Sequence, residues 1–185
     1  PFEIEIGYGL IPLVDANQGG NLLDRISTIR KSLAIELGIV VPPIRIRDNI
    51  QLGSSEYVFK IHDVEVVKGE VMLDYFLVLN PNDSIELVGV DTTEPTFGLP
   101  AKWISKDQKE RAEASGFTVV EPPAVIATHL MEVIKGKAWK LFDRQETQRM
   151  LDHLKETHGA VVEGLVPELL PLGTVTQVLK NLLKE

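Results

Sequence analysis

The 185-residue sequence contains no cysteine, which excludes disulfide bonds, thiolate metal sites and a cysteine nucleophile. It has no apolar run of membrane-spanning length, and no basic segment followed by an apolar one at its amino terminus. Basic residues are few: 19 Lys and Arg stand against 27 Asp and Glu, a formal net charge of −8. Because nucleic acids and anionic membranes are normally bound by a basic face, this balance argues against both partners.

Motifs of common catalytic and metal sites are also missing. The sequence has no Gly-Lys-Ser/Thr phosphate loop and no Gly-x-Ser-x-Gly elbow, and "GYGLIPL" lacks the third glycine of a dinucleotide loop. His153 and His158 are five residues apart, which puts them on different faces of a helix. We therefore predict no catalytic residue, no metal and no cofactor. One enzymatic alternative stays open, a carboxylate pair in a cleft between domains, because 27 acidic residues are present.

What is present is the composition of an ordinary globular protein, with 44% hydrophobic and 25% charged residues. The sequence starts at Pro1 inside an apolar run and stops at "VLKNLLKE" while an amphipathic helical pattern continues. We therefore expect a fragment of a longer protein.

The first part of the sequence predicts a β, α, β order followed by a hairpin. "FEIEI" alternates as a half-buried strand does, and "IRIRD" does the same after two prolines. Between them, apolar residues recur at helical spacing, with Asn21 as the helix cap and Gly38 as its end: Leu22, Ile26, Ile29, Leu33 and Leu37. "EYVFKIHDVEVVKGEV" then holds two alternating runs with "HD" between them, which predicts a hairpin.

Residues 73–121 change character and predict a small α+β module inserted into the first one. Short strands are expected at "YFLVL", "IELVG" and "TVVE", with a short helix over "ISKDQKERAEASGF" that ends at Gly116. Everything after "EPP" is expected to be helical, with the helices separated by Gly159, Pro167, Pro171 and Gly173. The predicted fold class is therefore α+β with a helical end.

One stretch, "EPTFGLPAKWI" (94–104), concentrates two prolines, a glycine, a phenylalanine and a tryptophan in a chain with only 6% aromatic residues. It is either a packed loop or a surface that contacts a partner. From residue types alone, a packed core position is the preferred interpretation for Phe97, Leu99, Trp103 and Ile104.

Several ordered blocks closely resemble the cytoplasmic half of the export-gate family that flagellar and virulence type III secretion systems share. The blocks include "IEIGYGLIPLVD", "EYVFKIHDVEVVKGEV", "EPTFGLPAKWI" and "GFTVVEPPAVIATHLMEVIKG", and the resemblance covers essentially the whole chain. The "ATHL" block favours the flagellar branch, with a virulence-type homologue as the alternative. The resemblance implies the cytoplasmic portion of an inner-membrane protein, built of four subdomains that assemble into a nonameric ring.

The resemblance also implies a division of the chain. Residues 1–72 plus 122–141 would form a thioredoxin-like, mixed α/β first subdomain, and 73–121 an inserted ferredoxin-like (RNA-recognition-like) subdomain. Residues 142–185 would begin a helical, ring-forming subdomain that is incomplete. RNA is not an expected ligand, because the aromatic pair on which bases stack is missing and the net charge is negative.

In this family, export chaperones carrying filament-type substrates dock in the groove between the first two subdomains. The resemblance puts Phe97 and Leu99 in a hydrophobic dimple of that groove and Glu94 at its rim, and it adds Leu79, Pro81, Val120, Val125 and Thr128. The implied function is a non-enzymatic docking platform that also contacts other export apparatus components. A third alternative is a purely structural role, in which the chain contributes only ring contacts through its helical end.

Overall fold

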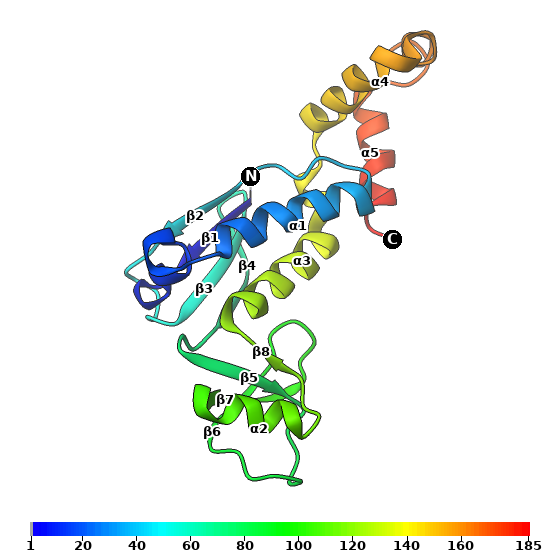
Figure 1. Ribbon diagram of the computed structural model, residues 1–185. Helices are drawn as coiled ribbons and strands as arrows, with labels where there is room; N and C mark the ends of the chain where they lie inside the picture. The colour runs from blue at the N-terminus through cyan, green and yellow to red at the C-terminus, as the bar shows by residue number, and fades with distance from the viewer. Residues whose placement is uncertain (1) are drawn as a thin grey trace.

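The structure is a computed structural model that describes residues 2–185. Figure 1 shows three parts: sheet A with two long helices lies in the middle, sheet B with a short helix lies at one end, and an arm of two helices extends away at the other end. The α+β prediction with a helical end is confirmed. Within the described range, none of the helices combines the length and the apolar character that a membrane crossing requires.

Sheet A contains four strands in the order β2-β1-β3-β4. Strand β1 (Phe2–Ile6) is parallel to β2 (Ile44–Asp48) and antiparallel to β3 (Glu56–Ile61), which pairs in turn with β4 (Val64–Glu70). His62 and Asp63 both have positive φ, as a tight hairpin turn requires, so the predicted hairpin is confirmed. A parallel βαβ unit followed by a hairpin and a closing helix is the order of a thioredoxin-like unit.

Helix α1 (Leu22–Leu37) crosses between β1 and β2 and buries the predicted apolar stripe against sheet A, except that Leu37 at its end is only half-buried. It ends at Gly38, whose φ of 68° is the left-handed conformation that glycine adopts without strain. The predicted cap at Asn21 is wrong in one respect. The Asn21 side chain makes no bond to the helix amides, because its Oδ1 accepts a hydrogen bond from Arg25 Nε at 3.3 Å.

Sheet B is fully antiparallel, in the order β6-β7-β5-β8. Its elements are β5 (Tyr75–Leu79), β6 (Gly89–Thr93), β7 (Pro100–Ser105), α2 (Lys109–Ala114) and β8 (Val119–Val120). Strand order and directions are those of a ferredoxin-like sheet in which residues 80–88 replace the first crossover helix.

The strand predicted at "IELVG" (85–89) is wrong, because β6 begins only at Gly89. The Gln108 side chain explains the difference. It accepts a hydrogen bond from the Val88 N–H at 2.9 Å and donates one to the Val88 carbonyl at 2.7 Å. Leu87 packs into the small core of this part of the molecule. The backbone groups of Val88 are thus satisfied by a side chain rather than by a strand ladder.

Helix α3 (Pro122–Leu141) connects all three parts. Figure 1 shows it running from β8, past sheet A and α1, to the arm. Proline at its first position fits the helix start, where no amide partner is needed. Its apolar face is completely buried along most of its length: Val125, Ile126, Leu130, Ile134 and Ala138.

The arm consists of α4 (Arg144–Leu165) and α5 (Leu172–Leu182). Asp143 caps the start of α4, and its Oδ1 accepts a hydrogen bond from the Glu146 N–H at 2.9 Å. The helix separation predicted at Gly159 is present, because α4 is broken at the adjacent His158. Gly173, also predicted to separate helices, lies instead in the first turn of α5, where a Cβ would meet the Arg144 guanidinium.

Candidate docking site

The β6–β7 hairpin ends in a turn, residues 94–99, whose shape is fixed largely by Glu94. The two carboxylate oxygens of Glu94 accept hydrogen bonds from the Thr96 N–H at 2.8 Å and the Phe97 N–H at 2.7 Å. The Glu94 backbone binds Leu99 O at 2.8 Å and Gly98 N at 3.0 Å. Gly98 has a φ of +71°, which favours glycine at this position. The turn is therefore held by both the backbone and the side chain of one residue.

This turn divides the "EPTFGLPAKWI" stretch into a buried and an exposed part. Trp103 and Ile104, on β7, belong to the cores, at 4% and 0% exposure. Phe97, at the tip, is 64% exposed, so the preference for a core position at Phe97 is wrong. Glu94, predicted at a rim, is only 6% exposed. An exposed aromatic on a fixed turn has the character of a contact surface.

Two other predicted residues emerge at the same end of sheet B. Strand β5 ends at Leu79, which pairs with Ala101 at the start of β7. The Asn80 N–H donates to the Pro100 carbonyl at 2.8 Å, directly beside the turn. Leu79 and Pro81 are both half-buried. The structure therefore brings Leu79, Pro81, Glu94, Phe97 and Leu99 to one end of the sheet.

The remaining predicted residues lie on β8 and α3. Val120 pairs with Leu77 of β5, and both pack in the large core that the two sheets share. Val125 is 3% exposed and belongs to the same core, so it offers little surface to a partner. Thr128, three residues further along α3, is half-buried.

A buried polar pair that the sequence did not indicate lies between α3 and sheet A. The Tyr57 hydroxyl on β3 and His129 Nδ1 on α3 share a hydrogen bond of 2.7 Å. Burial lowers the pKa of His129 and raises the pKa of the Tyr57 hydroxyl. The negative charge of Glu94 acts on both groups and pushes both pKa values upward. The only signal for this pair is the "ATHL" block, which contains His129.

Two hollows lie where sheet B meets the first part of the molecule. The smaller, of about 280 Å³, is lined by residues of β5, α2, β8 and the start of α3, including Phe76, Lys109, Val120 and Ala124. The larger, of about 540 Å³, reaches from Phe76 and Glu121 to the start of α1 at Asn21. Of the predicted site residues, only Val120 lines these two hollows.

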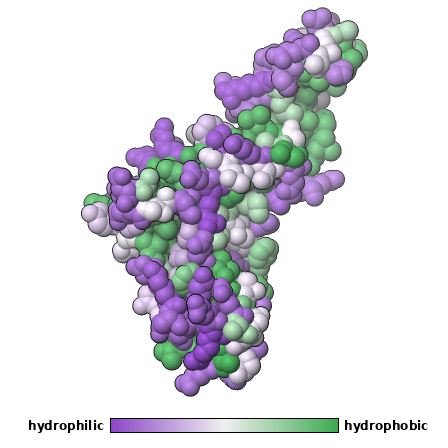
Figure 2. Space-filling model, in the orientation of Figure 1, coloured by the Kyte–Doolittle hydropathy of each residue, from purple (hydrophilic) through white to green (hydrophobic). Residues whose placement is uncertain are grey.

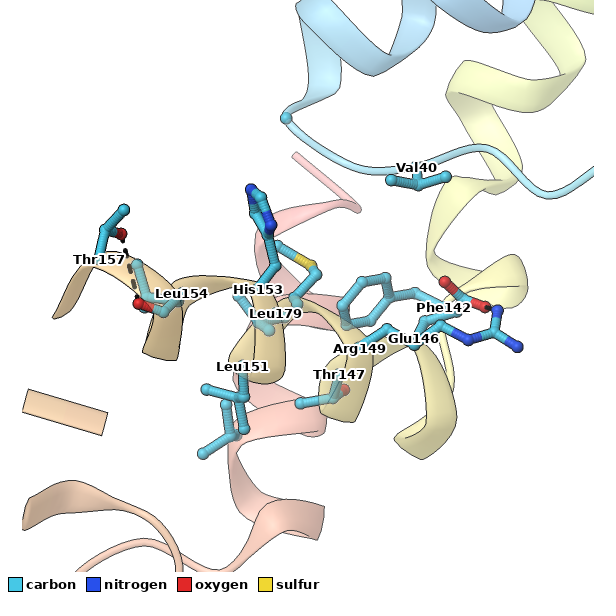
Figure 3. Close-up of a pocket in the computed structure, with 13 residues that line it drawn as sticks. Val40, Phe142, Glu146, Thr147, Arg149, Leu151, His153, Leu154, Thr157 and Leu179 are labelled. Carbon is cyan, nitrogen blue, oxygen red and sulfur yellow. Dashed lines mark hydrogen bonds and ion pairs between the residues drawn. The ribbon is translucent and has the colours of Figure 1, made fainter. Parts of the chain in front are cut away.

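A third, mainly apolar pocket of about 590 Å³ lies on the arm. Figure 3 shows that its lining comes from α4, from Leu179 on α5 and from Val40 in the loop after α1. Figure 2 shows hydrophobic residues gathered along the same arm, next to a hydrophilic edge. The sequence carries a signal for this surface in the spacing of Met150, Leu151 and Leu154.

The two buried carboxylates lie on different sheets, Glu5 on β1 and Glu94 after β6. Glu5 accepts hydrogen bonds from Lys60 Nζ at 2.6 Å and Asn49 Nδ2 at 2.8 Å, and these bonds lower its pKa. Across residues 2–185, no group of three or more His, Asp or Glu side chains is arranged to hold a metal ion.

Comparison with known proteins finds relatives along the entire sequence. The FHIPEP family model matches residues 1–185. The flagellar biosynthesis protein FlhA of Bacillus subtilis (strain 168) is 53% identical over 186 residues, which covers 100% of this chain and 28% of that protein. FlhA of Treponema pallidum (strain Nichols) is 48% identical, with 100% and 26% covered. The chain thus spans about a quarter of the length of these relatives.

Solved structures with the same fold come from related proteins at lower identity. The CdsV protein of Chlamydia pneumoniae matches with a TM-score of 0.82 at 24% identity, covering 99% of this chain and 54% of CdsV. CdsV in its complex with CdsO matches with a TM-score of 0.80, again at 24% identity, with 99% and 54% covered. The nonameric EPEC SctV-C, solved by cryo-EM, matches with a TM-score of 0.67 at 18% identity, with 100% and 54% covered. At these identities the likeness concerns the fold alone.

Proposed function

The chain belongs to the FHIPEP family, and from this premise we propose that it acts as the cytoplasmic docking platform of a flagellar type III export gate. Export chaperone–substrate complexes would bind between the first two subdomains, residues 1–72 plus 122–141 and 73–121. The complete protein would be anchored in the inner membrane. The flagellar branch is favoured over the virulence branch by 53% identity to a flagellar relative, against 24% or less to CdsV and SctV-C.

The observation that carries this proposal is the exposed ring of Phe97 on a turn that is already fixed. Phe97 is 64% exposed, and its amide is bound by Glu94 at 2.7 Å. A partner that buries this ring gains apolar contact area. Because the turn is already ordered, binding loses little conformational entropy, and these two features are typical of an interface anchor. Leu99, Leu79 and Pro81 are half-buried around the same end of sheet B and supply further apolar surface.

The test is calorimetric titration of the 185-residue chain with a flagellar export chaperone bound to its filament-type substrate. Phe97→Ala should weaken binding roughly tenfold or more while circular dichroism shows an unchanged fold. Val88→Ala is the matched control, because Val88 is 71% exposed in the same part of the molecule and outside the proposed site. Equal affinity of wild type and folded Phe97→Ala would contradict the proposed site.

Docking is favoured over the alternative of carboxylate-pair catalysis by the bonds of the two buried carboxylates. Glu5 is engaged by Lys60 and Asn49, and Glu94 by two backbone amides. A general acid or base has to face a substrate with at least one free oxygen, and these two groups are directed into the protein instead.

Ring assembly through residues 142–185 is a second part of the proposal. It is supported by the apolar pocket of the arm and by the nonameric assembly of SctV-C. The complex of CdsV with CdsO similarly supports contacts with other export apparatus components. In sedimentation velocity over a concentration series, Val40→Glu at the pocket edge should reduce self-association. Ile35→Glu, 86% exposed on α1, is the control. A wild type that stays monomeric, or equal behaviour of wild type and Val40→Glu, would argue against this contact.

A further inference from the structure

We propose that Glu94 is a positioning residue: its buried carboxylate holds the turn that presents Phe97, and it acts on partner binding through Phe97 rather than by touching the partner. This inference rests on the docking function proposed above and deepens it. It assigns different roles to two residues that lie three positions apart, one as the contact and the other as its support.

The exposures of the two side chains separate these roles. Phe97 is 64% exposed, whereas Glu94 is 6% exposed. Each carboxylate oxygen of Glu94 already accepts one backbone N–H, from Thr96 at 2.8 Å and from Phe97 at 2.7 Å. A partner approaching this turn therefore meets the phenyl ring, while the carboxylate is occupied behind it.

No other side chain of the turn can replace this support. Thr96 Oγ1 is buried and, among the described residues, has no hydrogen-bond partner, so it fixes nothing. Without the Glu94 carboxylate, the amides of Thr96 and Phe97 would lose their acceptor, and half-buried donors without acceptors are costly. Only the backbone bonds from Glu94 to Gly98 and Leu99 would remain.

The charge of the Glu94 carboxylate also acts beyond its own turn, because it pushes the pKa values of Tyr57 on β3 and His129 on α3 upward.

The first test uses amide hydrogen exchange, measured by NMR on the 185-residue chain without any partner. The Thr96 and Phe97 amides should be protected in wild type and in Thr96→Val, which removes only the unbonded hydroxyl. Glu94→Ala should speed their exchange roughly tenfold or more, since each loses a charge-assisted hydrogen bond. Glu94→Asp, which keeps both acceptor oxygens, should restore most of the protection.

Glu94→Gln gives an independent version of this test should the alanine variant fold poorly. The glutamine amide offers one acceptor oxygen, so one of the two amides should lose protection while the other keeps it. Unchanged exchange of both amides in folded Glu94→Ala and in Glu94→Gln would overturn the proposal.

The second test is a double-mutant cycle with the chaperone–substrate complex, using Phe97→Leu so that residual binding stays measurable. Glu94→Ala should weaken binding roughly tenfold in the wild-type background and much less in the Phe97→Leu background, because its effect passes through Phe97. Equal losses in both backgrounds would show direct contact and overturn the proposal. If the wild type does not bind the complex, the docking function is wrong, and so is the role of Glu94 in binding. Whether Glu94 holds the turn is decided by the hydrogen-exchange experiment alone.

Discussion

The hydroxyl of Tyr57 lies 2.7 Å from Nδ1 of His129, a residue 72 positions later in the sequence, and this bond joins strand β3 to helix α3 inside the core. Tyr57 is 0% exposed and His129 is 3% exposed, so water cannot replace either partner. The Phe59 ring packs against both rings, with centroids 5.2 Å from each. A polar pair enclosed in this way contributes to stability mainly because leaving one member alone is costly.

Tyr57→Phe should therefore lower the free energy of unfolding by about 1–3 kcal/mol, because it keeps the ring and leaves His129 without its partner. Urea unfolding followed by circular dichroism measures this difference. The control is Tyr8→Phe, since Tyr8 is 69% exposed and its hydroxyl is free to bind water. A Tyr57→Phe variant as stable as Tyr8→Phe would show that the buried pair contributes nothing.

Gly69 is the cross-strand neighbour of Tyr57, and a Cβ at this position would collide with the Tyr57 hydroxyl and ring. The tyrosine cannot move aside easily, because it is enclosed and bonded to His129. Gly69→Ala should therefore destabilise the protein by about 1–3 kcal/mol, as overpacked core sites do. Thermal unfolding provides the measurement.

Gly136 on α3 is the matched control for that substitution. Its Cβ position is open and it lies in the interior of a helix, so Gly136→Ala should stabilise by about 0.5–1 kcal/mol. If Gly69→Ala and Gly136→Ala shift the midpoint temperature of thermal unfolding in the same direction, close packing against Tyr57 is not the reason for glycine at position 69.

His129 should also make stability depend on pH. Burial lowers its pKa from the ordinary 6.5, partly opposed by the charge of Glu94, so as pH falls the unfolded chain takes up a proton first. The free energy of unfolding should be constant above about pH 7.5 and should decrease below pH 6.5, by as much as about 1 kcal/mol by pH 5.5. Glu5 affects stability only at lower pH. Its pKa is lowered from 4.5 in the folded protein, so its contribution to the free energy of unfolding is lost only as the pH falls below that value.

His129→Gln removes the group responsible and should flatten the change between pH 7.5 and pH 5.5, measured by urea unfolding at each pH. His153→Gln is the control, because the His153 side chain is 86% exposed on α4. If the free energy of unfolding falls with pH as steeply in His129→Gln as in wild type, another group is responsible for the pH dependence.

Much of the fold could be predicted because burial repeats with the period of each element. Leu22, Ile26, Ile29 and Leu33 are all buried on one face of α1, where the sequence put them. The prediction failed where a distant side chain decides the local structure. Nothing in "IELVG" indicates that Gln108, 20 residues later, binds the Val88 backbone and that no strand forms before Gly89.

The candidate site shows the same division. Residue types favoured a core position for Phe97, yet its turn points the ring outward, and only three-dimensional structure reveals that. The resemblance implied a rim position for Glu94, but its side chain is buried and accepts hydrogen bonds from two amides of its own turn. The family resemblance identified residues 94–99 as part of a docking site. The different roles of Glu94 and Phe97 become apparent only from their hydrogen bonds and exposures in the structure.

The arm contains a buried pair of hydroxyls that connects its two helices. Thr147 Oγ1 on α4 and Thr176 Oγ1 on α5 lie 2.7 Å apart, and each also lies 2.9 Å from a carbonyl oxygen of its own helix. Two hydroxyl hydrogens cannot serve three such contacts. One threonine must donate to the other, which in turn donates to its own helix.

This sharing predicts strong coupling between the two positions. Thr147→Val keeps the branched shape and removes the bond between the helices, so it should cost about 1 kcal/mol of unfolding free energy, and Thr176→Val should cost a similar amount. The double variant should cost little more than either single one, because the bond between the helices can be lost only once. Urea unfolding of the four proteins measures the coupling, with Thr174→Val on the exposed side of α5 as the control. Costs that simply add would mean that the two hydroxyls stabilise their own helices separately and do not join α4 to α5.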